Sequence, residues 1–210
     1  MAVFLFNPAL ISAQHRRDPR LLIEGGFGVN LSYFDVGGGT PGPSFQGGAS
    51  FDLHPNLRLG ASVSFHRTRG RDRGTLNEDR NYAYSSNLKE VGIRASYCYK
   101  PPYRSQHPVL RRFEPRAYAG LGILQIQDIK NSPLTGRTLK DRPPDIAPVF
   151  SLGAGLAFRL NKDLSLAMEG GTNLTTSDYL EGFGSGQFST SKDLFHSLIV
   201  KLSYRVESFE

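Results

Sequence analysis

Apolar and polar residues alternate with a period of two along most of the chain. Between Leu21 and Phe34 one parity is largely apolar, whereas the other holds mostly small or polar residues. Because successive side chains of a β-strand point to opposite faces, this alternation predicts a strand with one apolar face. The pattern recurs in seven later segments: residues 44–53, 57–66, 81–99, 117–127, 149–160, 164–174 and 194–206. The sequence therefore predicts eight strands.

Two of the eight segments are less regular than the others. In residues 81–99 the parity slips near Leu88 and Lys89, which predicts a β-bulge at that point. In residues 117–127 both parities are apolar or glycine. The pattern therefore assigns inner and outer faces less cleanly in these two segments.

The connections between segments alternate between long and short. Two tight turns, His54-Pro55-Asn56 and Asn161-Lys162-Asp163, join the second segment to the third and the sixth to the seventh. Four long polar loops join other neighbours at the opposite end: residues 35–43, 69–80, 128–145 and 176–192. Long loops at one end and short turns at the other are typical of transmembrane β-barrels.

The composition of the second face separates a membrane barrel from a soluble one. A face exposed to water would carry many long polar side chains, whereas this face is dominated by Gly, Ser, Asn and Ala. Small residues fit the crowded interior of an eight-stranded barrel, which should be filled rather than porous. We therefore predict an all-β fold, an eight-stranded antiparallel up-and-down transmembrane β-barrel. A soluble β-barrel or sandwich is the alternative.

Several charged residues fall on the face predicted to line the interior. A buried charge without a partner is costly, so these residues should pair across neighbouring strands and leave no path for ions. The predicted interior charges are Glu24, Arg58, Glu90, Arg94, Glu169, Lys201 and Arg205.

Composition narrows the possible functions. Cys98 is the single cysteine in 210 residues, which excludes an intramolecular disulfide and a cysteine-rich zinc site. The net charge of +6 suits an anionic partner without identifying its kind.

Residues 1–14 carry no charged side chain and precede His-Arg-Arg, which predicts a secretory signal peptide with a truncated beginning. Residues 15–210 would then form a single barrel domain.

Patterns for catalysis or ligand binding are weak. His66 shares its parity with Ser62 and Ser64, but no orienting carboxylate is evident from the sequence. The glycine runs are not followed by helices, as phosphate cradles require, and fit close packing in a small barrel. Asp178 and Glu181 lack the spacing of an EF-hand calcium loop. We predict neither catalytic residues, nor a cofactor, nor a metal ion.

A first basic stretch, residues 67–74, reads Arg-Thr-Arg-Gly-Arg-Asp-Arg-Gly and is predicted to lie in an outward loop. Arginines in such a loop either contact lipopolysaccharide phosphates or are merely solvated. Binding of nucleic acid is not expected, because the aromatic residues belong to strands rather than to a basic platform.

A second basic stretch, residues 100–115, connects the fourth and fifth predicted strands. Its four prolines lower the entropy lost on binding, and its arginines and aromatic rings have the composition of interaction hot spots. The candidate partner contacts are Lys100, Arg104, Val109, Leu110, Arg111, Arg112, Phe113 and Arg116. A long disordered turn, or one that binds anionic headgroups, is the alternative.

Three stretches resemble the PorG-like outer-membrane proteins of Bacteroidetes. Residues 25–35, Gly-Gly-Phe-Gly-Val-Asn-Leu-Ser-Tyr-Phe-Asp, are similar to the opening strand of that family, and residues 80–99 resemble its fourth strand. Residues 160–182 resemble its seventh strand and contain Ser-Asp-Tyr-Leu-Glu, the most specific element. The likeness runs in order over about residues 21–206.

This resemblance implies a structural subunit of the type IX secretion machinery, which exports cargo bearing a C-terminal signal. Its implied partner is the periplasmic ring, made of a lipoprotein and its partner protein. Outer-membrane lipid, with lipopolysaccharide as a candidate, is the further partner expected of a membrane barrel. The N-terminus and residues 100–115 would be periplasmic, the long loops extracellular, and the protein not an enzyme. A small outer-membrane barrel with an acyl-hydrolase or adhesive role is the alternative.

Overall fold

The structure is a computed structural model that describes residues 21–33, 38–72, 79, 83–100, 112–131, 146–176, 180 and 193–206. The predicted signal peptide therefore lies outside the described residues. Among the described residues, no helix is long and apolar enough to cross a membrane.

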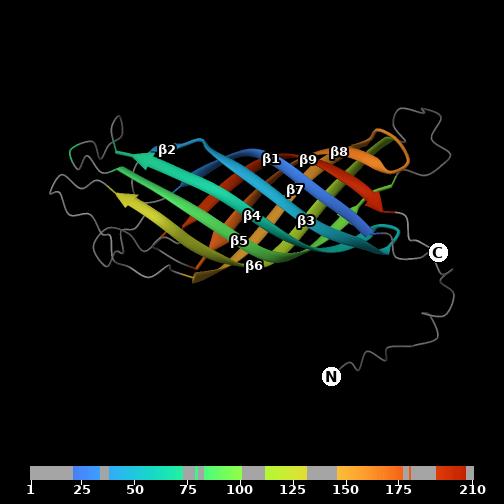
Figure 1. The fold of residues 1–210 in the computed structure, drawn as a ribbon, viewed down its shortest axis with the longest axis horizontal. Coiled ribbons are helices and arrows are strands. Elements are labelled where there is room, and N and C mark those ends of the chain that lie inside the picture. The colour runs from blue at the N-terminus through green and yellow to red at the C-terminus, as the bar shows by residue number, and fades with distance from the viewer. Residues whose placement is uncertain are drawn as a thin grey trace, which may run out of the picture.

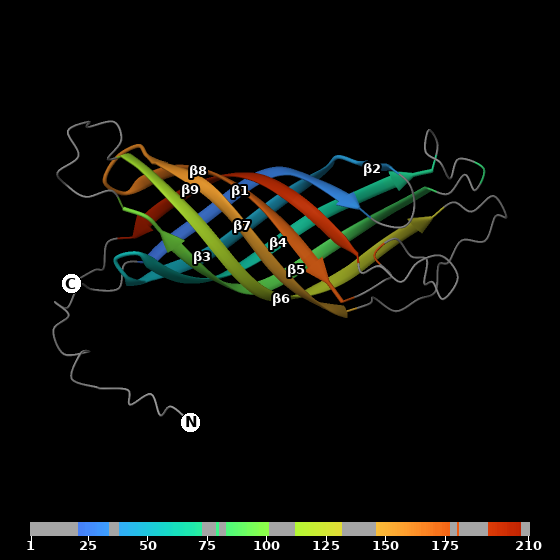
Figure 2. The same ribbon diagram turned by 180° about the vertical axis from the view of Figure 1, so that it is seen from behind.

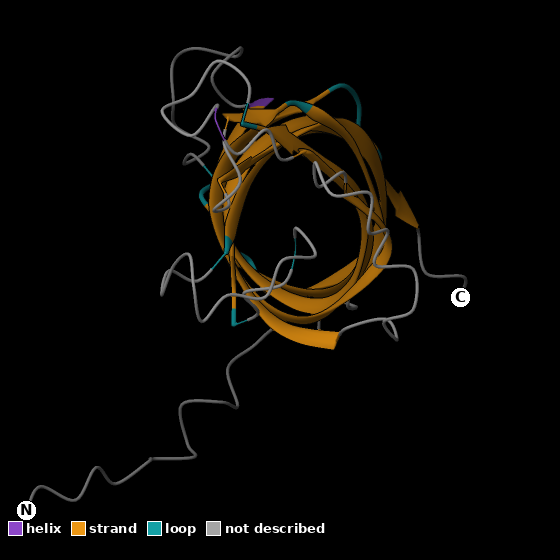
Figure 3. Ribbon diagram, turned by 90° about the vertical axis from the view of Figure 1, so that its left-hand side faces the viewer, coloured by secondary structure: helices purple, strands orange, loops and turns teal. Residues whose placement is uncertain are grey.

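The described residues form a single antiparallel sheet that closes into a barrel (Figures 1 and 2). Each long strand pairs with its neighbours in sequence, and the first, β1, pairs with the last, β9, so the ring seen down the barrel axis is complete (Figure 3). The strands are β1 Leu21–Tyr33, β2 Gly38–Thr40, β3 Gly42–His54, β4 Leu57–Arg71, β5 Ala83–Cys98, β6 Phe113–Asn131, β7 Ile146–Arg159, β8 Leu164–Thr175 and β9 Leu194–Val206. Because β2 pairs only with the end of β4, the described barrel has eight long strands, and the predicted fold class is confirmed.

The two ends of the barrel differ in their connections. The β3–β4 and β7–β8 turns lie at the same end as the start of β1 and the end of β9, where Leu21 is opposite Val206 (Figure 1). We call this the turn end and the opposite one the loop end. The backbone N–H of Cys98 donates to the carbonyl of Asn56 at 2.8 Å, which places the β5–β6 connection at the turn end as well.

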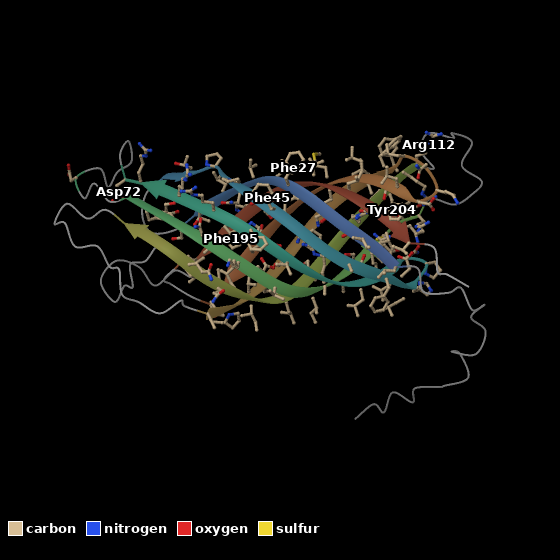
Figure 4. All side chains as sticks on the ribbon, viewed as in Figure 1. Phe27, Phe45, Asp72, Arg112, Phe195 and Tyr204 are labelled. Carbon is tan, nitrogen blue, oxygen red and sulfur yellow. The ribbon has the colours of Figure 1, made fainter. Side chains whose placement is uncertain are left out.

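Alternation along each strand separates the inner and outer faces as expected. On β9, Phe195, Ile199 and Lys201 are buried inside, whereas Leu198 and Val200 are exposed outside. Large apolar side chains remain exposed around the whole outer wall, among them Phe27, Phe45 and Tyr204 (Figure 4). A water-soluble protein rarely exposes a contiguous apolar surface of this extent, so the wall is suited to lipid.

Three of the predicted loops are shorter than expected. Strand β4 continues to Arg71 and β6 to Asn131, while β2 and Gly42 occupy positions assigned to the first loop. Residues 67–71 are therefore strand, and their prediction as loop is wrong. On β4, backbone pairing continues beyond the apolar belt to positions where the outward residues are arginines, so apolar alternation no longer marks the strand.

The irregularity predicted near Leu88 and Lys89 is present slightly earlier, in the pairing of β5 with β6, but β5 itself does not change face there. Tyr84, Ser86, Leu88 and Glu90 all lie inside, so β5 keeps its alternation through this point. The irregularity lies in the β5–β6 register between Ser85 and Asn87. The apparent slip arises because Leu88 faces an apolar part of the interior.

Paired glycines on β7 and β8 make room for an aromatic ring inside the barrel. Gly153 and Gly171 are opposite each other, and Tyr118 lies beside them on the interior face of β6. A Cβ atom on Gly171 would lie 2.0 Å from the Tyr118 hydroxyl, and one on Gly153 would lie 2.5 Å from it. Glycine is required here for close packing, which is the role expected for the glycine run at residues 153–155.

Substitution of an outward residue at two depths tests the assigned wall. Val200→Arg, at the middle of β9, should lower the free energy of unfolding in bilayers by about 2–4 kcal/mol, because a cation in mid-membrane loses its hydration. Val206→Arg, at the end of the same strand, should cost about 0–1 kcal/mol. Denaturant titration of refolded protein in lipid vesicles measures both values. Equal costs at the two positions would contradict the assigned membrane depth.

Candidate functional site

Glu169 on β8 is the centre of a buried ionic cluster. Its carboxylate accepts hydrogen bonds from Arg94 Nη1 at 2.8 Å, from Arg116 Nη1 at 3.2 Å and from the ammonium of Lys201. Lys201 comes from the adjacent β9, whereas Arg94 and Arg116 come from β5 and β6. The cluster therefore links strands that are not neighbours in the barrel wall. The Arg94 guanidinium also lies 3.9 Å from the centre of the Tyr118 ring, a cation–π contact.

The cluster extends toward the turn end through shared arginines. Arg116 contacts Glu114 at 3.2 Å and Glu24 at 3.7 Å, and Arg58 contacts Asp52 at 3.1 Å. Within this cluster, four carboxylates face four cations: Glu24, Asp52, Glu114 and Glu169 against Arg58, Arg94, Arg116 and Lys201. Equal numbers of opposite charges allow the cluster to be buried without an uncompensated ion.

Two of the predicted interior charges lie outside this cluster. Glu90 is buried beside His66, with 3.8 Å between its Oε2 and the His66 Nε2. Arg205 is half-buried at the turn end and donates to the carbonyl of Lys162 at 3.4 Å. The other five predicted residues, Glu24, Arg58, Arg94, Glu169 and Lys201, are brought together.

Sequence reasoning missed three members of the cluster, Asp52, Glu114 and Arg116. Arg116 was expected at the partner surface because the fifth strand was predicted to begin at residue 117. In the structure β6 begins at Phe113, and the Arg116 side chain is buried among interior carboxylates. Its assignment as a partner contact is therefore corrected. Arg116 and Tyr118 are two positions apart and therefore lie on the same face of a strand. This spacing could have predicted that Arg116 points into the barrel.

The remaining candidate partner contacts lie at the turn end where the structure describes them. Arg112 is exposed (Figure 4), and Lys100 approaches Asp52 at 3.9 Å. Phe113 belongs to β6 and packs against Phe158, with 5.0 Å between ring centres. Four further candidates lie outside the described residues: Arg104, Val109, Leu110 and Arg111.

His66 lies in a buried polar group that sequence reasoning found only in part. Its Nδ1 and the hydroxyl of Ser44 are 2.9 Å apart, and Glu90 lies on its other side. Ser44 is opposite His66 in the β3–β4 register, a pairing that the sequence alone does not reveal. Asn30 also donates to the Ser44 hydroxyl, at 3.0 Å.

A serine, a histidine and a carboxylate could in principle support nucleophilic catalysis. Here, however, the Ser44 side chain has no exposed surface, and His66 is 4% exposed. Nucleophilic attack requires the substrate to reach the serine oxygen, so this geometry is better suited to a buried hydrogen-bonded link between β1, β3 and β4. Ser64, which was also considered, accepts a hydrogen bond from the Gln46 amide at 3.1 Å.

An apolar cluster fills the interior near the loop end. It consists of Leu88, Leu124, Ile126, Val149, Leu180 and Phe195. Leu180 belongs to the Ser-Asp-Tyr-Leu-Glu element between β8 and β9. Its carbonyl accepts from the Ser86 hydroxyl at 2.7 Å, and its N–H donates to Asp193 Oδ2 at 3.1 Å. We call this cluster the apolar plug; the ring of Phe195 joins it to His66, with 5.1 Å between centres.

Little space remains among the interior charges. A cavity of about 30 Å³ is lined by Glu24, Arg58, Arg94, Arg116, Glu169 and Lys201, together with residues of β3 and β4. Such a volume holds roughly one or two water molecules. In the part of the chain that the structure describes, no group of three or more His, Cys, Asp or Glu side chains could hold a metal ion.

Solved structures with a similar fold include two outer-membrane proteins. Neisserial surface protein A has a TM-score of 0.56 and is 13% identical, over 89% of this chain and 97% of that one. The outer membrane protein OprG from Pseudomonas aeruginosa has a TM-score of 0.55 and is 8% identical, over 90% of this chain and 97% of that one. The fold is that of outer-membrane eight-stranded β-barrels. No protein-family model matches the chain, and no curated protein matches it in sequence.

Removal of the central carboxylate tests the ionic cluster. Glu169→Gln should lower the free energy of unfolding by about 3–5 kcal/mol, because three cations are left facing a neutral amide in a buried site. The matched control, Asp163→Asn, removes a carboxylate that lies 3.7 Å from Lys162, a residue 77% exposed. It should cost about 0–1 kcal/mol. Urea titration in detergent micelles measures the free energy of unfolding of both variants. A loss in Glu169→Gln no larger than the loss in Asp163→Asn would contradict the stabilising role of the cluster.

Proposed function

We propose that this protein is a structural outer-membrane subunit of the type IX secretion machinery that anchors its periplasmic ring to the outer membrane. The observation that carries the proposal is the filled interior beneath an apolar wall. Ion pairs occupy the turn-end half and the apolar plug the loop-end half. A barrel filled in this way is suited to anchoring, since its described interior has little space for solute passage or for a substrate.

The assignment to a secretion machine rests on the sequence resemblance to PorG-like proteins. The most specific element of this resemblance, Ser-Asp-Tyr-Leu-Glu, contains Leu180. This residue is part of the apolar plug and is hydrogen-bonded to Ser86 and Asp193. A leucine packed into the interior near the loop end is suited to an anchor that must not leak. The likeness to solved barrels supports the fold that such an anchor needs.

We place the turn end in the periplasm and the loop end outside the cell. In outer-membrane barrels the short turns are periplasmic and the long loops extracellular. Both termini and the β5–β6 connection would then face the periplasm, where ring proteins are found. The contacts proposed for the ring are Lys100, Arg104, Val109, Leu110, Arg111, Arg112 and Phe113, which would meet an acidic patch.

Reversal of two charges in this segment tests the proposed docking. Arg111→Glu/Arg112→Glu should abolish co-purification of the ring proteins from detergent-solubilised membranes, because like charges would then face the acidic patch. The barrel itself should stay folded and heat-modifiable on gels. The matched control is Arg159→Glu/Lys162→Glu, which reverses two exposed cations at the same end. Full retention of the ring proteins by the first variant, or equal loss from both, would contradict docking through residues 111 and 112.

A further inference from the structure

A row of exposed cations lies on the outer wall of the barrel at the loop end. Arg67, Arg69 and Arg71 occupy alternate positions of β4, so all three side chains point outward, and each is exposed. Lys89 on β5 is also exposed and lies opposite Phe65. We call these four residues the basic ladder. The strand structure of residues 67–71 creates the ladder, since a loop would not hold the side chains on one face.

The ladder directly follows the apolar belt on the same strand. Outward positions of β4 from Leu57 to Phe65 carry apolar residues, of which Leu57, Val63 and Phe65 are 41–47% exposed. The next three outward positions are the arginines. Alternate residues of a strand are about 6.8 Å apart, so the three arginines span about 14 Å along β4 immediately beyond the belt. This is the depth at which lipid headgroups meet a membrane barrel.

Neighbouring strands do not neutralise the ladder. Arg69 faces Thr40 and Ser85, and Arg71 faces Gly38 and Ala83, while Arg67 faces Asn87. Among the described residues, no carboxylate forms an ion pair with any of the four cations. The row therefore offers four positive charges to an anionic ligand.

An apolar surface borders the ladder on the side of the belt. Phe45 and Phe65 are opposite each other across β3 and β4 and are 56% and 47% exposed. They line a depression of about 440 Å³, whose other lining residues are Pro43, His66, Arg67, Asn87, Leu88, Lys89 and Gln127. Two cations of the ladder, Arg67 and Lys89, and two exposed aromatic rings therefore line the same depression.

We propose that the basic ladder binds the phosphorylated headgroup of a lipid A-type glycolipid, whose acyl chains lie against Phe45 and Phe65. Charge complementarity favours a headgroup with more than one phosphate, because four cations follow one another along the wall. Guanidinium groups bind phosphate oxygens in a bidentate manner, and three of the four cations are arginine. The outer-leaflet location uses the orientation proposed above, whereas the binding surface does not depend on any secretion partner.

Native mass spectrometry of the purified full-length protein in detergent tests this proposal. The probe is diphosphoryl lipid A, and dephosphorylated lipid A and phosphatidylglycerol are measured in parallel. Arg67→Gln/Arg69→Gln/Arg71→Gln should weaken binding of diphosphoryl lipid A at least tenfold. The matched control, Arg112→Gln/Arg159→Gln/Lys162→Gln, removes three exposed cations at the turn end and should change the affinity less than twofold.

Each contrary result overturns a defined part of the proposal. Unchanged binding by the ladder variant, or an equal loss in the control, would exclude the ladder as the site. Equal affinity for dephosphorylated lipid A would exclude phosphate recognition, and equal affinity for phosphatidylglycerol would exclude a lipid A-type ligand. The single variant Arg69→Gln, with an expected loss of at least twofold, provides the same test if the triple variant does not fold. The binding measurement contains no ring protein. A negative result for lipid A binding is therefore distinguishable from a negative result for ring docking.

Discussion

The contact of Glu169 with three cations is the interaction on which the rest of the interior depends. Lys201 reaches it from the adjacent strand, whereas Arg94 and Arg116 reach it across the lumen from β5 and β6. A wall that is apolar on its outside must place its charges inside, and charges inside must be paired. Closure of the barrel, its strand register and the ionic cluster are therefore mutually dependent.

The periodic pattern predicted the fold because the barrel is built on it. Outward residues such as Leu198 and Val200 and inward residues such as Lys201 are separated by parity alone, and parity is visible in the sequence. The strand ends were less predictable. Beyond Phe65 the outward positions of β4 become arginines, so apolar alternation stops while backbone pairing continues to Arg71. The apparent change of parity at Leu88 has a related cause. Leu88 faces inward, and the interior near the loop end is apolar rather than polar.

The candidate sites were less predictable than the fold because they depend on contacts across the barrel. Parity placed Glu24, Arg94 and Glu169 inside, but their partners depend on which strands face one another after closure. Ser44 meets His66 through the β3–β4 register, and Leu180 enters the plug from a segment without strand periodicity. Arg116 was assigned to a connection because the strand was predicted to begin at residue 117, four residues after the start of β6 at Phe113.

Ion pairs and the apolar plug fill the described interior, and the proposed role as an anchor rather than a pore depends on this filling. Single-channel recording of the purified full-length protein in a planar lipid bilayer tests this claim most directly, with a known porin as the positive control. We expect that insertion of this protein produces no conductance steps at voltages where the porin conducts. Reproducible steps from the wild-type protein would contradict a filled interior.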